Sequence, residues 1–369
     1  MHLEKSVEKK DFFVEKDDLS NSRWHSKKID SIDSHQILIK IDSFSFTSNN
    51  ITYAILGESM KYWQFFPVAS QLGQIPVWGI GTVVESHIDD IRVNDQFYGF
   101  YPMSNYLILE PGKIKQTGFT DITEHRNRLP VIYNNYTNIR FDQTFDQEYS
   151  DIHMLMQPLF ATSFLIADML VSNNFYGSQS VIFSSASSKT AIAAAYLLKE
   201  YGVELIGLTS NANAESVKSL NLYSKVVPYS EISDLALDKL NVFIDFAGNI
   251  HLNETLAKKE GIQFTKTLLI GNSHSTSMPE INNESLLQKV LKAEYFFAPL
   301  QYRRRMKELG AREFSVKFNN DWVNFRVYCR SWMNIKKFKS MSEVEQMYLQ
   351  TREGKNNPLE GNIVTTSDL

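Results

Sequence analysis

The sequence predicts an α/β protein of two domains, with a β-rich first half followed by a doubly wound parallel sheet. Its 369 residues exceed the length at which a single hydrophobic core stops growing, so two domains are expected. From Val181 to Asn272, short apolar segments alternate with segments of helical periodicity. One of these segments, VFIDF at residues 242–246, is apolar enough to be a strand buried on both faces of a parallel sheet.

The first 110 residues carry a strand signal of a different kind. Apolar and polar side chains alternate in QILIKID (36–42), as in a half-buried strand, and IGTVVES (80–86) and QFYGFYP (96–102) repeat the signal. The stretch from Gly112 to Gln157 has no sustained period and is expected to be a long connection or decorated loop. The expected domains are a loosely ordered, highly charged segment at 1–25, a β-rich domain at 26–157 and 295–369, and a parallel-sheet domain at 158–294.

Composition and charge exclude several classes of partner. The chain has 38 basic and 42 acidic residues and a formal charge of −4, which gives no electrostatic footprint for nucleic acid or an anionic membrane. No run reaches the roughly 18 to 20 apolar residues of a membrane span, so we expect a cytoplasmic protein whose partner is a small molecule. The single cysteine, Cys329, excludes an internal disulfide and a zinc site built on thiolates, and the histidines lack metal-binding spacing, so no metal is expected.

Five stretches of the chain resemble one superfamily, in the same order. They are DSHQILIKIDSFSFTSNNITYAILG (33–57), WGIGTVVESHIDDIRVNDQFYGF (78–100), PLFATSFLIADML (158–170), VIFSSASSKTA (181–191) and VFIDFAGN (242–249). They resemble the medium-chain dehydrogenase/reductase superfamily, in particular its zinc-free quinone-oxidoreductase-like branch, and an uncharacterised bacterial family related to it. The resemblance implies a GroES-like catalytic domain, a Rossmann dinucleotide-binding domain and a homodimer. The Gly-His-Glu of the catalytic-zinc branch is replaced by Pro76, Val77 and Trp78 before Gly79.

The turn SSASSKT stands where that superfamily has its glycine-containing phosphate loop. Ser185, Ser188 and Ala191 fall at the three glycine places, and all three residues are small. Ser187 or Ser188 is a good N-cap, and a helix N-terminus favours an anion. The sequence therefore predicts a phosphate cradle, with a capped crossover that binds nothing as the alternative. The cradle residues are Ser185, Ser187, Ser188, Lys189 and Thr190.

Neutral donors follow the second strand of the parallel sheet, at Thr209, Ser210 and Asn211. An acidic residue at this place would take both ribose hydroxyls and repel a 2′-phosphate. The sequence therefore favours NADP(H) over NAD(H) as the cofactor, with Lys189 or Lys218 supplying positive charge.

Further cofactor contacts are expected at the ends of later strands. Asp245 is expected to be a structural carboxylate, while Ala247, Gly248 and Gly271 are expected to line the edge where an open α/β sheet binds ligands. By resemblance, Thr162 would bond the carboxamide of the nicotinamide.

The candidates for chemistry lie in the first half. A zinc-free reductase of the resembled kind needs a hydroxyl or amide near the substrate oxygen. Tyr53 is the candidate donor, with Asn49 and Asn50 orienting it, and Tyr62 belongs to an aromatic group in KYWQFFP that would wall an apolar pocket; core packing is the alternative for these rings. We expect a zinc-independent NADP(H)-dependent oxidoreductase that reduces an activated double bond or carbonyl of the quinone, enone or enoyl type. The alternatives are a catalytically inactive binding or regulatory protein with the same fold and, more weakly, a protein that delivers an acyl substrate to partners.

Overall fold

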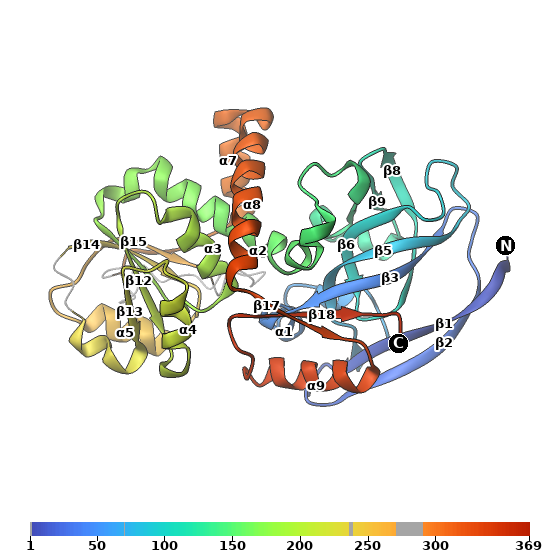
Figure 1. Ribbon diagram of the computed structural model, residues 1–369, viewed down its shortest axis with the longest axis horizontal. Coiled ribbons are helices and arrows are strands. Elements are labelled where there is room, and N and C mark those ends of the chain that lie inside the picture. Colours follow the sequence, from blue (N-terminus) through green and yellow to red (C-terminus); the bar gives the residue numbers. More distant parts are fainter. Residues whose placement is uncertain (1, 70, 236–238, 271–290) are drawn as a thin grey trace. The chain divides into compact units, whose positions relative to one another are not determined.

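The chain folds into two compact units (Figure 1). The computed structural model describes residues 2–69, 71–235, 239–270 and 291–369. Unit 1 comprises Met1–Leu155, Met333–Asn356 and Glu360–Leu369, and unit 2 comprises Met156–Trp332 and Asn357–Leu359.

Unit 2 is built on six parallel strands in the order β13-β12-β11-β14-β15-β16. The strands are β11 (Ser180–Phe183), β12 (Glu204–Thr209), β13 (Lys225–Pro228), β14 (Leu240–Asp245), β15 (Gln263–Leu269) and β16 (Ala293–Tyr295). The strand order reverses between β11 and β14, and ligands bind at the carboxyl ends of strands at such a switch point. The prediction of a doubly wound parallel sheet is confirmed.

Helices and short 3-10 turns connect these strands. They are α2 (Ser150–Ser172), η6 (Asn174–Gly177), α3 (Lys189–Leu198), η7 (Asn211–Asn213), α4 (Ala214–Ser219), η8 (Tyr229–Asp234), α5 (Ile250–Lys258), α7 (Ala298–Leu309) and α8 (Ala311–Trp332). The run Ala191–Ala195 of α3 is completely buried, because its small side chains let the helix lie close to the sheet. Val242, Phe243 and Ile244 of β14 are also completely buried, as the apolar run predicted.

One helix of the described residues, Gln147–Ser172, is long and apolar enough to cross a membrane by length and composition, although polar residues such as Gln157 and Asp168 interrupt its apolar run. Of its most apolar stretch, 67% is buried inside the structure, which is typical of a core helix.

Unit 1 contains a nine-stranded sheet in which eight strands follow the order β17-β18-β3-β5-β6-β10-β9-β8, while β7 pairs with β3. The strands are β3 (Ile37–Phe46), β5 (Pro76–Ser86), β6 (Gln96–Pro102), β7 (Tyr106–Leu109), β8 (Pro111–Lys115), β9 (Gly118–Asp121), β10 (Asn135–Asn138), β17 (Asn334–Phe338) and β18 (Glu360–Thr365). The helices are α1 (Ser48–Ile55), α9 (Met341–Arg352) and the 3-10 turns η1 (Tyr62–Gln64), η2 (Glu124–Arg126), η3 (Val131–Tyr133), η4 (Ile139–Phe141) and η5 (Gln147–Tyr149). Part of the expected connection at 112–157 therefore belongs to the sheet.

The expectation of a loosely ordered segment at residues 1–25 is wrong. Most of these residues form a long antiparallel ribbon, β1 (His2–Glu15) and β2 (Ser22–Ser31), which joins β4 (Leu72–Gly73) in a three-stranded sheet. Phe12 and Val14 of β1 are completely buried. The charged residues around this short apolar run conceal the pattern typical of a strand. The apolar side chains find a core only when the chain is folded, so tertiary packing decides that this segment is a strand.

The expected domain boundary near residue 295 is also wrong, because α7 and α8 belong to unit 2. Phe160 of α2 stacks on Phe325 of α8 with ring centroids 5.1 Å apart. Asp168 of α2, 2% exposed, pairs with Arg305 of α7 and with Lys317 of α8, whose Nζ lies 2.8 Å from Oδ1. Rings and ion pairs therefore join the two helices to α2.

Candidate functional site

The serine turn takes a conformation that normally requires glycine. Ser185 has φ of 48°, in the left-handed region, at the place of the first glycine of the dinucleotide fingerprint. Its N–H donates to the hydroxyl of Tyr229 at 2.8 Å, and the N–H of Ala186 donates to the carbonyl of Leu208 at 2.9 Å. The backbone conformation is thus held from both sides, and no glycine is needed for the chain to turn sharply after β11.

The helix after the turn begins as the sequence predicts, with Ser188 as N-cap. Its Oγ accepts a hydrogen bond from the N–H of Ala191 at 3.3 Å. The hydroxyl of Ser187 is not the cap and accepts instead from the side-chain amide of Asn213 at 3.2 Å. Helix α3 directs the N–H groups of its first turn, and the positive end of its dipole, toward the carboxyl edge of the sheet.

Other cradle residues are partly engaged within unit 2. The Nζ of Lys189 donates to the carbonyl of Pro358 at 3.4 Å, so a contact with phosphate stays a prediction. The carbonyl of Thr190 accepts from Ser163 Oγ at 2.8 Å, which ties α2 to α3. Thr162 lies half-buried on α2, beside Ser163.

The carboxyl end of β12 contains a buried hydroxyl that has no partner among the residues that the structure describes. Thr209 is 1% exposed, and its Oγ1 makes no hydrogen bond within the described ranges. Such an orphaned group is expensive to bury and is typical of a site that a ligand completes. Ser210 follows half-buried, and the exposed Asn211 accepts a hydrogen bond from the hydroxyl of Ser230 at 2.9 Å. Thr209, Ser210 and Asn211 thus lie at this edge, and their contact with a cofactor stays a prediction.

The central carboxylate is structural, as expected. Oδ1 of Asp245 accepts from Ser184 Oγ at 2.7 Å and from the N–H groups of Ala247 and Gly248 at 3.1 and 3.0 Å. Its Oδ2 accepts from the amide of Asn253 at 2.8 Å. Asp245 thus joins the ends of β11 and β14 at the switch point. The remaining predicted contact, Gly271, lies outside the described residues.

Two tyrosines outside the predicted site, Tyr223 and Tyr229, hold the serine turn. The hydroxyl of Tyr223 donates to the carbonyl of Ala186 at 3.0 Å, and Tyr229 holds Ser185. Burial raises the pKa of both phenols, so they stay neutral. The sequence signal that could have identified these residues is a pair of tyrosines close to KVVP (225–228). No dinucleotide fingerprint includes such a pair.

The predicted catalytic residues lie in an aromatic cluster of unit 1. The rings of Tyr53 and Tyr62 are 4.4 Å apart, and the hydroxyls of Tyr62 and Tyr133 are 3.2 Å apart. Tyr53 and Tyr62 are 5% and 3% exposed, so the rings are largely packed, as the core alternative expected. The other members of the aromatic cluster are Phe65, Phe66, Phe100, Leu129 and Trp78.

The phenol of Tyr53 is held in its protonated form. Burial raises its pKa well above the usual value, and the neighbouring phenol of Tyr133 acts in the same direction. Asn50 does not share this role, because its Oδ1 accepts from the N–H of Thr47 at 2.8 Å and its Nδ2 donates to the carbonyl of Pro76 at 2.9 Å. Asn50 therefore fixes α1, and the orientation of the Tyr53 phenol by Asn49 stays a prediction.

No three His, Cys, Asp or Glu side chains gather into a potential metal site within the described ranges.

The β-rich unit and the six-stranded sheet with its switch point give the medium-chain dehydrogenase/reductase fold. Three solved structures share it: CurA from Vibrio vulnificus in complex with NADPH (11% identity, TM-score 0.61), the quinone oxidoreductase from Coxiella burnetii (12%, 0.52) and the yhdH oxidoreductase from Salmonella enterica in complex with NADP (12%, 0.54). The matches cover 97% to 98% of this chain and 100% of each of those chains.

The chain belongs to the family described as "Protein of unknown function (DUF2855)", whose model matches residues 44–357. The comparison with curated protein sequences gave no match.

Proposed function

We propose that the protein is a zinc-independent, NADP(H)-dependent oxidoreductase that reduces an activated double bond or carbonyl of the quinone, enone or enoyl type. The observation that carries this proposal is the left-handed backbone of Ser185 at the switch point of the parallel sheet. A tight turn at that place is the first feature of the dinucleotide fingerprint, and it leads the chain into the helix whose N-terminus favours a pyrophosphate. The bound NADPH of CurA and the bound NADP of the yhdH oxidoreductase, which share the fold, support the choice of cofactor.

The residues of unit 2 fit a phosphorylated dinucleotide. The hydroxyls of Ser187 and Ser188 and the first turn of α3 would hold the pyrophosphate, as donors beside the positive end of the helix. The orphaned hydroxyl of Thr209 would gain a partner in the adenosine part of the cofactor. The bound cofactor would supply a hydride at C4 of its nicotinamide.

The residues of unit 1 fit a substrate whose oxygen gains negative charge. The neutral phenol of Tyr53 would donate a hydrogen bond to that oxygen and stabilise the charge as it develops. The aromatic cluster around Tyr53 is apolar. Arg126 packs its guanidinium on the rings of Phe65 and Phe66, but this group is already paired with Asp121. These surroundings favour a flat, uncharged acceptor such as a quinone.

Zinc independence is proposed because the single cysteine, Cys329, is completely buried in α8 and its pKa is raised by burial, the opposite of a metal-binding thiolate. The cytoplasmic location and the homodimer stay predictions from the sequence.

The first experiment is a fluorescence titration of the protein with NADPH and NADH, followed by turnover with a panel of quinones, enones and aldehydes. We expect NADPH to bind more tightly than NADH and at least one quinone to be reduced. The absence of binding up to millimolar cofactor would overturn the proposal. Binding without oxidation across the panel would favour the inactive binding protein.

Asn211→Asp should shift the cofactor preference toward NADH. The new carboxylate keeps the bond from Ser230 but repels a 2′-phosphate, so we expect the Kd for NADPH to rise about 10-fold, or about 1.4 kcal/mol, with little change for NADH. The matched control is Asn221→Asp, which makes the same charge change in an exposed turn after α4. Equal effects of the two variants on NADPH binding would place the 2′-phosphate away from β12.

Tyr53→Phe should lower kcat about 100-fold, the usual effect of losing one donor to a developing oxyanion, while the Kd for NADPH stays the same. The ring packing on Tyr62 survives, so the melting temperature should change little. Steady-state kinetics and thermal unfolding measure both effects. The matched control is Tyr62→Phe, which removes the hydroxyl that bonds Tyr133, and its kcat should fall much less.

The pH profile gives a second check on Tyr53. Its pKa is raised, so the neutral donor form is the only one present up to and beyond the usual phenol pKa of about 10. We therefore expect kcat to show no alkaline loss attributable to this phenol below about pH 10. An alkaline limb near pH 8 that disappears in Tyr53→Phe would contradict this role.

A further inference from the structure

The N-terminal ribbon, β1 and β2, precedes the stretch that the family model matches, which begins at residue 44. It nevertheless contacts one functional part of unit 1. This part is the aromatic segment, residues 57–69 and 71–74, which contains Tyr62, Phe65 and Phe66.

The ribbon is attached to the C-terminal end of the aromatic segment by backbone and side chains. Val14 and Glu15 pair with Gly73 and Leu72 of β4. The side-chain amide of Gln74 donates to Oδ1 of Asp11 at 2.7 Å, and both residues are buried, at 3% and 2% exposure. A buried hydrogen bond to a carboxylate is among the stronger contacts available to a neutral side chain.

The N-terminal end of the aromatic segment is reached by Lys16, the first residue of the turn between β1 and β2. The N–H of Lys16 donates to the carbonyl of Gln71 at 3.0 Å, while its Nζ lies 3.0 Å from Oε1 of Glu58. This one turn residue thus contacts both ends of the aromatic segment.

The middle of the aromatic segment is held by the indole of Trp63. A Cβ atom built on Gly57 would lie 2.1 Å from the indole Nε1, and one built on Gly73 would lie 2.6 Å from its Cζ3, so the ring contacts both ends of the segment. The indole also belongs to the core that contains Phe12 and Val14 of the ribbon. Trp63 directly follows Tyr62, so the position of the indole sets that of the tyrosine.

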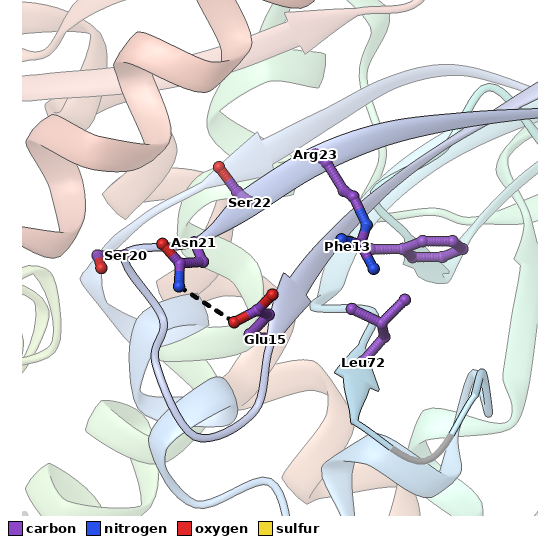
Figure 2. A pocket seen from close by; sticks show the side chains of 7 residues that line it. All are labelled: Phe13, Glu15, Ser20, Asn21, Ser22, Arg23 and Leu72. Atoms are coloured by element: carbon purple, nitrogen blue, oxygen red, sulfur yellow. Dashed lines mark hydrogen bonds between the residues drawn. The ribbon is translucent and has the colours of Figure 1, made fainter.

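The contact between the ribbon and the aromatic segment has a small pocket at the surface. A hollow of about 180 Å³ lies there, and Figure 2 shows Phe13 and Arg23 of the ribbon beside Leu72 of β4. Below this hollow, the bond between Gln74 and Asp11 joins two buried side chains across the contact.

The ribbon has a second, separate anchor. The N–H of Lys10 donates to Oδ1 of Asn105 at 2.7 Å, and the side-chain amide of Asn105 donates to the carbonyl of Glu8 at 3.2 Å. Asn105 is buried, at 4% exposure, and lies between β6 and β7. This anchor holds the ribbon without touching the aromatic segment.

We propose that the N-terminal ribbon positions the aromatic segment, and through it Tyr62 and the substrate, with Gln74 as the positioning residue. The inference rests on the proposed function for its kinetic consequence, but its structural consequence is independent of it. The ribbon would thus restrict the movement of the aromatic segment, beside which the proposed substrate binds.

The test compares Gln74→Met with Asn105→Leu, two near-isosteric changes that each remove a buried amide from the ribbon contacts. With 1,4-naphthoquinone as substrate, Gln74→Met should raise KM about fivefold, the usual effect of one lost hydrogen bond, while kcat and the Kd for NADPH stay within about twofold. Both variants should lower the melting temperature by a similar amount, but Asn105→Leu should leave KM unchanged.

Hydrogen–deuterium exchange of the full chain provides a readout that needs no turnover. Gln74→Met should accelerate exchange in peptides covering residues 58–74, and Asn105→Leu should not. Unchanged exchange in those peptides for Gln74→Met, or equal acceleration in both variants, would overturn the inference. If the unmodified protein reduces no quinone, the proposed function fails, while the exchange result still decides the role of the ribbon.

Discussion

Ser188→Asp is expected to raise the Kd for NADPH about 100-fold, or about 2.7 kcal/mol, without lowering the melting temperature. Aspartate caps a helix as well as serine does, so the bond from the N–H of Ala191 can be kept and α3 still begins at Lys189. The new carboxylate would lie where the proposed pyrophosphate lies, and two like charges in close contact repel strongly. Fluorescence titration and thermal unfolding of the same preparation measure the two effects.

The matched control is Ser188→Asn, which offers the same cap without the charge. Its Kd for NADPH should stay within about threefold of that of the unmodified protein, since asparagine and serine cap comparably. Equal affinities in the two variants would mean that no phosphate lies near residue 188. The capped-crossover alternative for the serine turn would then be preferred.

Arg126→Met is expected to lower the free energy of unfolding of unit 1 by about 3 to 5 kcal/mol. Arg126 is 1% exposed and its NH1 lies 2.8 Å from Oδ2 of Asp121, so the substitution leaves a buried carboxylate without its counter-charge. The same guanidinium donates to the carbonyl of Tyr133 at 2.7 Å and to Oδ1 of Asn134 at 3.0 Å. Chemical denaturation measures the loss.

The double variant Asp121→Asn, Arg126→Met separates the charge from the packing. Removing both charges should recover a large part of the stability that Arg126→Met loses, because no ion then remains buried and unpaired. A double variant as unstable as the single one would show that the bonds to Tyr133 and Asn134, rather than the ion pair, carry the effect.

The sequence by itself determined the parallel sheet and the character of its carboxyl edge. Strands such as VFIDF are recognisable because they are buried on both faces, and the N-cap at Ser188 follows from the side chain of a single residue. The neutral residues that end β12 were equally readable, and so were the bonds that Asp245 accepts from the N–H groups of Ala247 and Gly248, since these residues are neighbours in the chain. Local chemistry of this kind needs no knowledge of distant contacts.

The tertiary structure alone decided the features that depend on residues far apart in sequence. The charged N-terminal segment becomes a ribbon because Phe12 and Val14 reach a core completed by residues such as Trp63. The serine turn can do without glycine because the hydroxyl of Tyr229, 44 residues later, holds Ser185 in the left-handed conformation. Helix α8 joins unit 2 because its rings pack on Phe160. In each case the stabilising partner is brought close only by folding, so no local pattern contains it.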